Sequence, residues 1–189
     1  DIWDAHTASG KILQIGLELR YAAPTRKMRE WLPRLGRTKM LTCNEFRPPF
    51  LPKRGAIDDW ITQKRYSGGT LLEKNCHHFD LFNWFAASRP VRVFASGDNQ
   101  TVYADTDVLD NAFVTVEYEN GLRAMLSLCL FAPKKAPESS LNELEFGILG
   151  DRGRLEMRGD DVFVWNRTDG AEESWHYARQ NFEAHSDDK

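Results

Sequence analysis

One short stretch, residues 67–85, holds several groups that could move a proton. It runs SGGTLLEKNCHHFDLFNWF and carries Glu73, His77 and Asp80 among apolar residues. Ionisable side chains are seldom buried without partners, because removing their water is costly. In a continuous helix His77 lies one turn after Glu73 and one turn before Asp80, so both carboxylates can reach its ring. Such an imidazole, held at one nitrogen, keeps the other nitrogen for acid–base chemistry.

The same side chains allow two other interpretations. The Glu–His–Asp group would also suit a structural hydrogen-bond network in the core. His77, His78 and the distant His176 are metal-ligand types, but adjacent residues of a helix point about 100° apart. No H-E-x-x-H spacing occurs either. We therefore expect no metal here. Gly68 and Gly69, just before the helix, would let a ligand approach the backbone closely.

The elements that position this stretch follow from hydrophobic periodicity and turn residues. The pattern predicts strands at 10–20 and 39–46, a helix over 24–36, and a long irregular loop over 47–69. After the helix of residues 67–85 the chain becomes rich in strands, predicted at 90–97, 112–118, 122–130, 143–150, 154–157, 161–165 and 173–178. These elements predict an α+β fold with an open, largely antiparallel sheet and helices packed on one face.

Asn120-Gly121 lies between two alternating runs and predicts a hairpin. One face of this hairpin is wholly apolar. The opposite face is only weakly polar and carries Phe113, Thr115, Met125, Ser127 and Cys129, with Glu117 and Arg123 as its charges. Such a face suggests cover by another subunit or domain, so we expect a homo-oligomer formed through the sheet.

Composition excludes several classes of protein. The 189 residues carry a net charge of -3, which does not fit a nucleic-acid-binding surface. No apolar run approaches the roughly 20 residues of a membrane span, and no signal peptide opens the chain. Three widely spaced cysteines suit reduced thiols, which favours a cytoplasmic protein over a disulfide framework.

Three segments together resemble the C-terminal half of the glucose–fructose oxidoreductase/inositol dehydrogenase (Gfo/Idh/MocA) family. ASGKILQIGLELRYAAPTRKMREWL is similar to the stretch that leaves the family's nucleotide domain, and ILGDRGRLEM to a late hairpin. DDWITQKRYSGGTLLEKNCHHFDLFNWF is similar to the family's W…GG-x-L-x-[DE]-x-x-x-H-x-x-D-x-x-x-W segment. The resemblance implies a glyceraldehyde-3-phosphate dehydrogenase-like C-terminal domain over residues 1–189, serving substrate binding, catalysis and oligomerisation.

The resemblance also implies an NAD(P)-dependent oxidoreductase that acts on a sugar- or cyclitol-like alcohol. His77 matches the proton-transferring histidine, and Glu73 and Asp80 match its acidic neighbours, although Glu73 replaces the usual Asp. Trp60, Arg20 and Tyr21, with Gly68 and Gly69, match positions beside the substrate. Ile61 replaces an arginine that often follows the tryptophan.

The family's glycine-rich turn and catalytic E-K-P lysine are absent from the sequence. GILGDRG (147–153) lies between two predicted strands and suits a hairpin turn better than a pyrophosphate loop. The chain begins with Asp1, so we expect the N-terminal nucleotide-binding domain, and most of the NAD or NADP site, to lie upstream, and this fragment alone to be inactive. Two alternatives stay open: an NAD-using glycosidase or lyase of the same family, or a non-catalytic ligand-sensing or scaffold domain.

Overall fold

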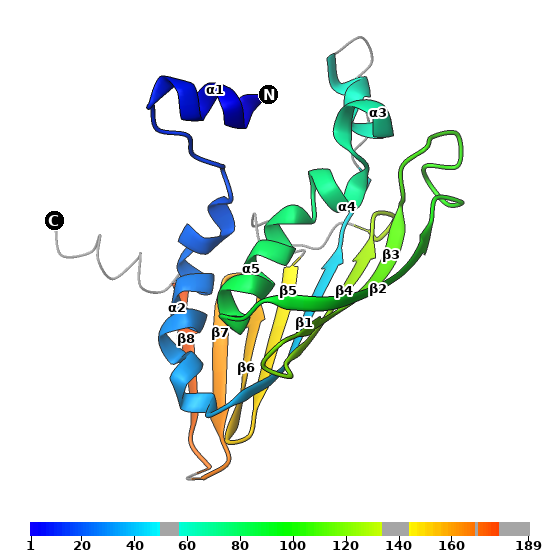
Figure 1. The fold of residues 1–189 in the computed structure, drawn as a ribbon. Helices are drawn as coiled ribbons and strands as arrows, with labels where there is room; N and C mark the ends of the chain where they lie inside the picture. Colours follow the sequence, from blue (N-terminus) through cyan, green and yellow to red (C-terminus); the bar gives the residue numbers. More distant parts are fainter. Residues whose placement is uncertain (50–56, 134–143, 169, 178–189) are drawn as a thin grey trace, which may run out of the picture.

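The fold is one eight-stranded sheet with helices on one side (Figure 1). A computed structural model describes residues 1–49, 57–133, 144–168 and 170–177. The strand order is β2-β3-β4-β1-β5-β6-β7-β8, and every neighbouring pair is antiparallel except β1 and β4. The strands are β1 (Thr38–Phe46), β2 (Pro90–Asp98), β3 (Asn111–Tyr118), β4 (Arg123–Cys129), β5 (Leu144–Gly150), β6 (Gly153–Arg158), β7 (Asp161–Asn166) and β8 (Glu172–His176). The predicted α+β class and open sheet are confirmed.

The hairpin predicted at Asn120-Gly121 joins β3 to β4. Gly121 has a φ of 82°, a backbone conformation that side chains other than glycine rarely adopt. The two faces of the hairpin separate as the alternation predicts. The buried face is formed by Ala112, Val114, Val116, Tyr118, Ala124, Leu126, Leu128 and Leu130.

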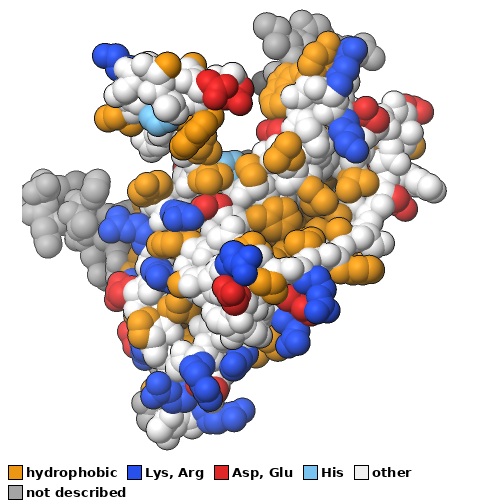
Figure 2. All heavy atoms as spheres, viewed as in Figure 1, with side chains coloured by type: hydrophobic (Ala, Val, Ile, Leu, Met, Phe, Trp, Pro, Cys, Tyr) orange, Lys and Arg blue, Asp and Glu red, His pale blue; other side chains and the backbone are white. Residues whose placement is uncertain are grey.

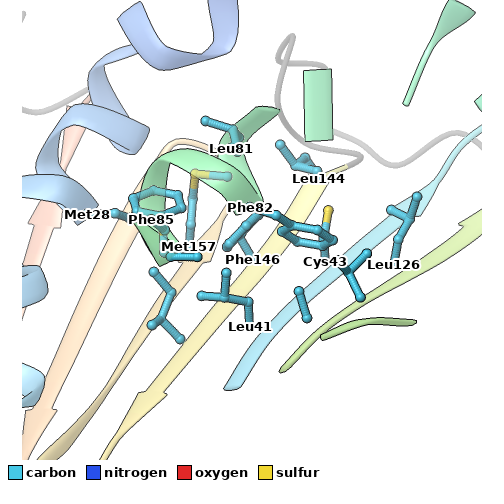
Figure 3. Packing of buried hydrophobic residues seen from close by; sticks show 14 of the residues in the cluster. Met28, Leu41, Cys43, Leu81, Phe82, Phe85, Leu126, Leu144, Phe146 and Met157 are labelled. Carbon is cyan, nitrogen blue, oxygen red and sulfur yellow. The ribbon is translucent and has the colours of Figure 1, made fainter. Parts of the chain in front are cut away.

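Two helical segments cover the inner face of the sheet (Figure 1). The first is α2 (Ala23–Trp31), which continues into the 3-10 turn η2 (Leu32–Leu35) and ends at Gly36, while the second is α5 (Cys76–Ala86). Met28 of α2 and Phe82 and Phe85 of α5 enter the core that Figure 3 shows, where both Phe rings contact Phe146 of β5. The helix predicted over residues 24–36 is therefore confirmed.

The outer face of the sheet carries no described helix. Phe94, Phe113, Met125 and Met40 lie on it in four neighbouring strands, and their side chains are 72%, 65%, 40% and 52% exposed. We call these four residues the outer patch. This face is the weakly polar one that the sequence predicts to be covered. No described helix is both long and apolar enough to cross a membrane.

The strand predicted over residues 10–20 is wrong. Residues 11–17 form no regular element, and η1 (Glu18–Tyr21) is a 3-10 turn. With α1 (Ile2–Ser9), this N-terminal segment stands away from the sheet (Figure 1), and Figure 2 shows apolar side chains on its surface. Ile12 is 97% exposed and Ile15 is 69% exposed. A strand needs a neighbour to pair with, and no described strand lies beside this one.

The loop predicted over residues 47–69 is only partly correct. Residues 50–56 lie outside the described part of the chain, but the rest contains η3 (Ile57–Thr62) and α3 (Lys64–Ser67). The predicted helix of residues 67–85 is also divided, into α4 (Thr70–Glu73) and α5 (Cys76–Ala86). That division changes which groups meet at the candidate site.

Candidate active site

His77 lies in the first turn of α5, and its partner comes from another segment. Its Nδ1 atom lies 3.3 Å from Oε2 of Glu18, an ion-pair distance without hydrogen-bond geometry. The His77 side chain is 20% exposed, whereas Glu18 is 67% exposed. Nδ1 itself is shielded from solvent, so the exposed part of the side chain lies away from this atom. A carboxylate therefore faces the shielded nitrogen of a partly accessible imidazole.

The break between α4 and α5 removes Glu73 from this arrangement. At the break the amide of Asn75 bonds the carbonyl of Thr70, five residues back, at 3.4 Å, and the amide of His78 bonds the carbonyl of Asn75 at 3.0 Å. An inserted residue of this kind rotates the following turns, and such π-type bulges are frequent at functional sites. The predicted contact of Glu73 with His77 is wrong, since no hydrogen bond or ion pair joins them in the described structure.

Asp80 is occupied by a different partner. Its two carboxylate oxygens accept from Nε and NH2 of Arg20 at 2.6 and 2.5 Å, a bidentate pair. This hydrogen bonding raises the pKa of Arg20. The Arg20 guanidinium also lies 5.8 Å from the ring centroid of Trp84. The pair fastens η1 to α5, so Asp80 holds the segment that carries Glu18 rather than the His77 ring itself.

A buried polar cluster that the sequence analysis missed lies beside this turn. Glu45 of β1, Asn75 and His78 are 3%, 0% and 2% exposed. Oε2 of Glu45 accepts from Nδ2 of Asn75 at 3.0 Å and lies 3.1 Å from Nε2 of His78. Lys74 and Arg47 each place a nitrogen 3.7 Å from the other carboxylate oxygen. We call these five residues the Glu45 cluster.

The sequence contained a signal for two of the three buried members, Glu45 and His78. Leu41, Cys43 and Glu45 alternate along β1, which places the glutamate on the same inner face as two core residues. His78 lies three and four residues before the core residues Leu81 and Phe82, whereas the residue three after His77 is the charged Asp80. Burial lowers the pKa of His78 to about 3, so this imidazole is neutral in the folded protein.

The other predicted substrate-facing residues are distributed around the same end of the fold. Tyr21, in η1, is 73% exposed, and Trp60, in η3, is 38% exposed. Gly68 and Gly69 have φ angles of 78° and 94° and join α3 to α4. Glycine is favoured at both positions because the backbone turn between α3 and α4 needs positive φ angles. The predicted role of all four beside a substrate stays a prediction.

The chain provides no dinucleotide loop and no metal cluster within its described part. GILGDRG forms the end of β5, a tight turn and the start of β6, as predicted. No three His, Cys, Asp or Glu side chains of the described residues come together as metal ligands. Within the described residues, the candidate site therefore consists of the partly exposed His77 and the Glu18 carboxylate beside it.

The chain is similar in sequence to one protein family and to a bacterial relative. Residues 25–156 match the family model described as the GFO/IDH/MocA C-terminal domain. The Bacillus subtilis (strain 168) protein YteT is 29% identical over 100 residues, which cover 51% of this chain and 23% of YteT.

Among solved structures, a super-repressor mutant of Gal80p from Saccharomyces cerevisiae shares the fold with a TM-score of 0.76 at 15% identity, over 98% of this chain and 54% of that one. Levoglucosan dehydrogenase in complex with NADH and levoglucosan has a TM-score of 0.74 at 15% identity, over 93% and 50%. UDP-N-acetylglucosamine 3-dehydrogenase GnnA from Acidithiobacillus ferrooxidans has a TM-score of 0.66 at 18% identity, over 92% and 49%. The chain thus spans about half the length of these structures.

Proposed function

This chain belongs to the GFO/IDH/MocA family as its C-terminal domain, and from that premise we propose that it is the substrate-binding and proton-transferring half of an NAD(P)-dependent dehydrogenase. The proposed substrate is a sugar- or cyclitol-like alcohol. Two proteins of the same fold are named as dehydrogenases of levoglucosan and of UDP-N-acetylglucosamine, which supports this substrate class.

The observation that carries the proposal is the partly accessible His77 ring with a carboxylate at its shielded nitrogen. Glu18 stabilises a proton on Nδ1, which leaves Nε2 as the basic nitrogen. Nε2 accepts the hydroxyl proton of the substrate during oxidation and returns it during reduction.

A nicotinamide cofactor, when bound, supplies the hydride acceptor of such a reaction. We propose that the upstream domain holds it, whether NAD or NADP, because this chain offers no glycine-rich pyrophosphate loop. His77 would then face the substrate from the side opposite the cofactor. Arg20 and Asp80 keep η1 against α5, so that Glu18 stays at the ring.

The test is turnover of the full-length protein that contains this chain, measured as the absorbance of reduced nicotinamide with a panel of sugars and cyclitols. We expect His77→Ala to lower kcat by about 10²–10⁴, the usual contribution of a positioned acid–base group. His176→Ala is the matched control, since His176 also faces a carboxylate, Asp161 at 2.9 Å, but lies on β8. Equal activity of the two variants would refute the assignment.

Two other functions stay as alternatives within the family. An NAD-using glycosidase or lyase would also need His77 as an acid–base group, but would release no net reduced cofactor. A non-catalytic sensing or scaffold domain is favoured by the likeness in fold to Gal80p, whose structure is that of a super-repressor mutant. Ligand binding without turnover in the full-length protein would select this last role.

We also propose that the outer patch mediates self-association. Its exposed Phe and Met side chains continue across β2, β3, β4 and β1, and apolar surface of this kind usually marks an interaction site.

The three cysteines are free thiols, which supports the cytoplasm as the compartment.

A further inference from the structure

The Glu45 cluster lies directly beside the turn that carries His77, although none of its members is a predicted catalytic group. Among the described residues, Oε2 of Glu45 lies 3.0 Å from Nδ2 of Asn75 and 3.1 Å from Nε2 of His78. In sequence these two partners flank Cys76 and His77. One carboxylate oxygen from β1 thus contacts the residue on each side of the short segment that presents the imidazole.

The protonation state of His78 decides which of its ring nitrogens can donate and which can accept a hydrogen bond. Burial keeps His78 neutral, and a neutral imidazole has one donor and one acceptor nitrogen. Nδ1 accepts from Nδ2 of Asn75 at 3.1 Å, so the ring proton lies on Nε2, the nitrogen 3.1 Å from Oε2 of Glu45. Asn75 donates to both partners, and these two hydrogen bonds together with the close approach of Glu45 to Nε2 fit one tautomer of His78.

The charge of Glu45 is balanced from the other side. Nζ of Lys74 and NH1 of Arg47 lie 3.7 Å from Oε1, and these two cations are only 28% and 23% exposed. A buried carboxylate without such partners would be strongly unfavourable. Lys74 lies at the break between α4 and α5, so the ion pair also ties the break itself to β1.

The backbone hydrogen bonds change spacing at the break: those of Lys74 and Phe79 reach four residues back at 3.0 Å, whereas that of Asn75 reaches five. The amide of Asn75 reaches the carbonyl of Thr70 at 3.4 Å, a long hydrogen bond, and Asn75 has a φ of -86° and a ψ of -2°, outside the usual helical values. α4 is a single turn of four residues. Side-chain contacts therefore add to the backbone hydrogen bonds that orient the start of α5, and those of Asn75 and Lys74 lead to Glu45.

We propose that Glu45 is a positioning residue for His77: it fixes the α4–α5 break from the sheet, so that the imidazole meets Glu18 and the substrate in one orientation. This inference rests on the proposed function of His77. It assigns to a buried residue of β1 a role in the reaction that acts through Asn75, His78 and Lys74.

The test compares Glu45→Gln with Glu45→Asp in the full-length protein. Glutamine keeps the size but removes the charge, so its amide faces Lys74 and Arg47. Aspartate keeps the charge but loses one methylene of reach to Asn75 and His78. We expect each variant to lower kcat by about 10–100-fold with little change in KM, because misplacing a catalytic group by about 1 Å costs up to 10²-fold.

Glu156→Gln is the matched control. Glu156 is a strand carboxylate, 9% exposed, with a guanidinium on each side from Arg154 and Arg158, but it belongs to the opposite face of the sheet. We expect this variant to keep the wild-type kcat. If Glu45→Gln does not fold, Asn75→Ala removes the hydrogen bonds to Glu45 and His78 and leaves the ion pairs, and the same fall in kcat is expected.

A second readout separates positioning from general stability. We expect the rate at which diethylpyrocarbonate modifies His77, followed by peptide mass spectrometry, to change at least about threefold in Glu45→Gln and to stay unchanged in Glu156→Gln. Unchanged kcat and modification rates in the Glu45 variants, with His77→Ala inactive, would overturn the positioning role alone. Full activity of His77→Ala would instead overturn the proposed function on which it rests.

Discussion

Acidification should destabilise this chain through His78, and the size of the effect can be worked out. Folding lowers the pKa of His78 from 6.5 to about 3, chiefly by burial. Below about pH 6.5 the unfolded chain takes up a proton that the folded chain excludes, so the free energy of unfolding falls as the pH falls. The loss begins at the unfolded pKa and is complete near pH 3.

The magnitude follows from the width of this window. Each pH unit between the two pKa values is worth about 1.4 kcal/mol. At about pH 4.5, two units below the unfolded value, the loss from His78 alone is therefore about 2.7 kcal/mol. That is a large fraction of the total stability of about 5–15 kcal/mol that is usual for a domain. The groups that face the ring are Glu45 from β1, Asn75, Lys74 and His77 from its own segment, and Arg47.

The assay is urea unfolding of the wild type and of His78→Gln at a series of pH values from about 7 to 4.5. Glutamine keeps an N–H donor for Glu45 and does not titrate. The titrations of groups that do not contact residue 78 are common to both proteins and cancel in the difference. We expect the advantage of the wild type to shrink by about 2.7 kcal/mol over this range. Parallel curves would refute the assignment of His78 as a neutral, buried partner of Glu45.

Two further changes test the support of the site and the outer face. Asp80→Asn removes the charge from the bidentate pair with Arg20 and should lower the free energy of unfolding by about 1–3 kcal/mol; an unchanged urea midpoint would show that this pair does not hold η1. Replacing Phe113 and Met125 of the outer patch together by Glu should convert the full-length protein to a smaller species in analytical ultracentrifugation, because like charges and lost apolar contact oppose association. An unaltered sedimentation profile would exclude self-association through this face.

The sheet and its two faces were predictable because they depend on short-range patterns. Alternation along residues 112–118 and 122–130 assigns each side chain to a face, and Asn120-Gly121 supplies the turn that pairs the two strands. The helix over residues 24–36 follows in the same way from Pro24 near its start and Gly36 at its end. In each case the physical cause lies within a few residues of its effect.

The position of β1 in the sheet was not predictable from such patterns. β1 lies between β4 and β5, parallel to the first and antiparallel to the second, and its partners are about 80–110 residues away in the sequence. Its alternation marks Glu45 as inward-facing, but only the packing of α5 over this strand brings the carboxylate to Asn75 and His78.

The candidate site also combines features that local sequence predicts with features that only long-range packing decides. His77 and its acidic neighbours could be singled out from residue types and spacing alone, since Glu73 and Asp80 have helical separations from it. That argument assumed one continuous helix. The structure breaks the helix at Asn75. Beyond the break, His77 lies next to Glu18, and Asp80 accepts hydrogen bonds from Arg20. The local sequence therefore determined which imidazole could do acid–base chemistry, whereas its partner was decided by a contact over a long sequence separation, which only the folded chain brings about.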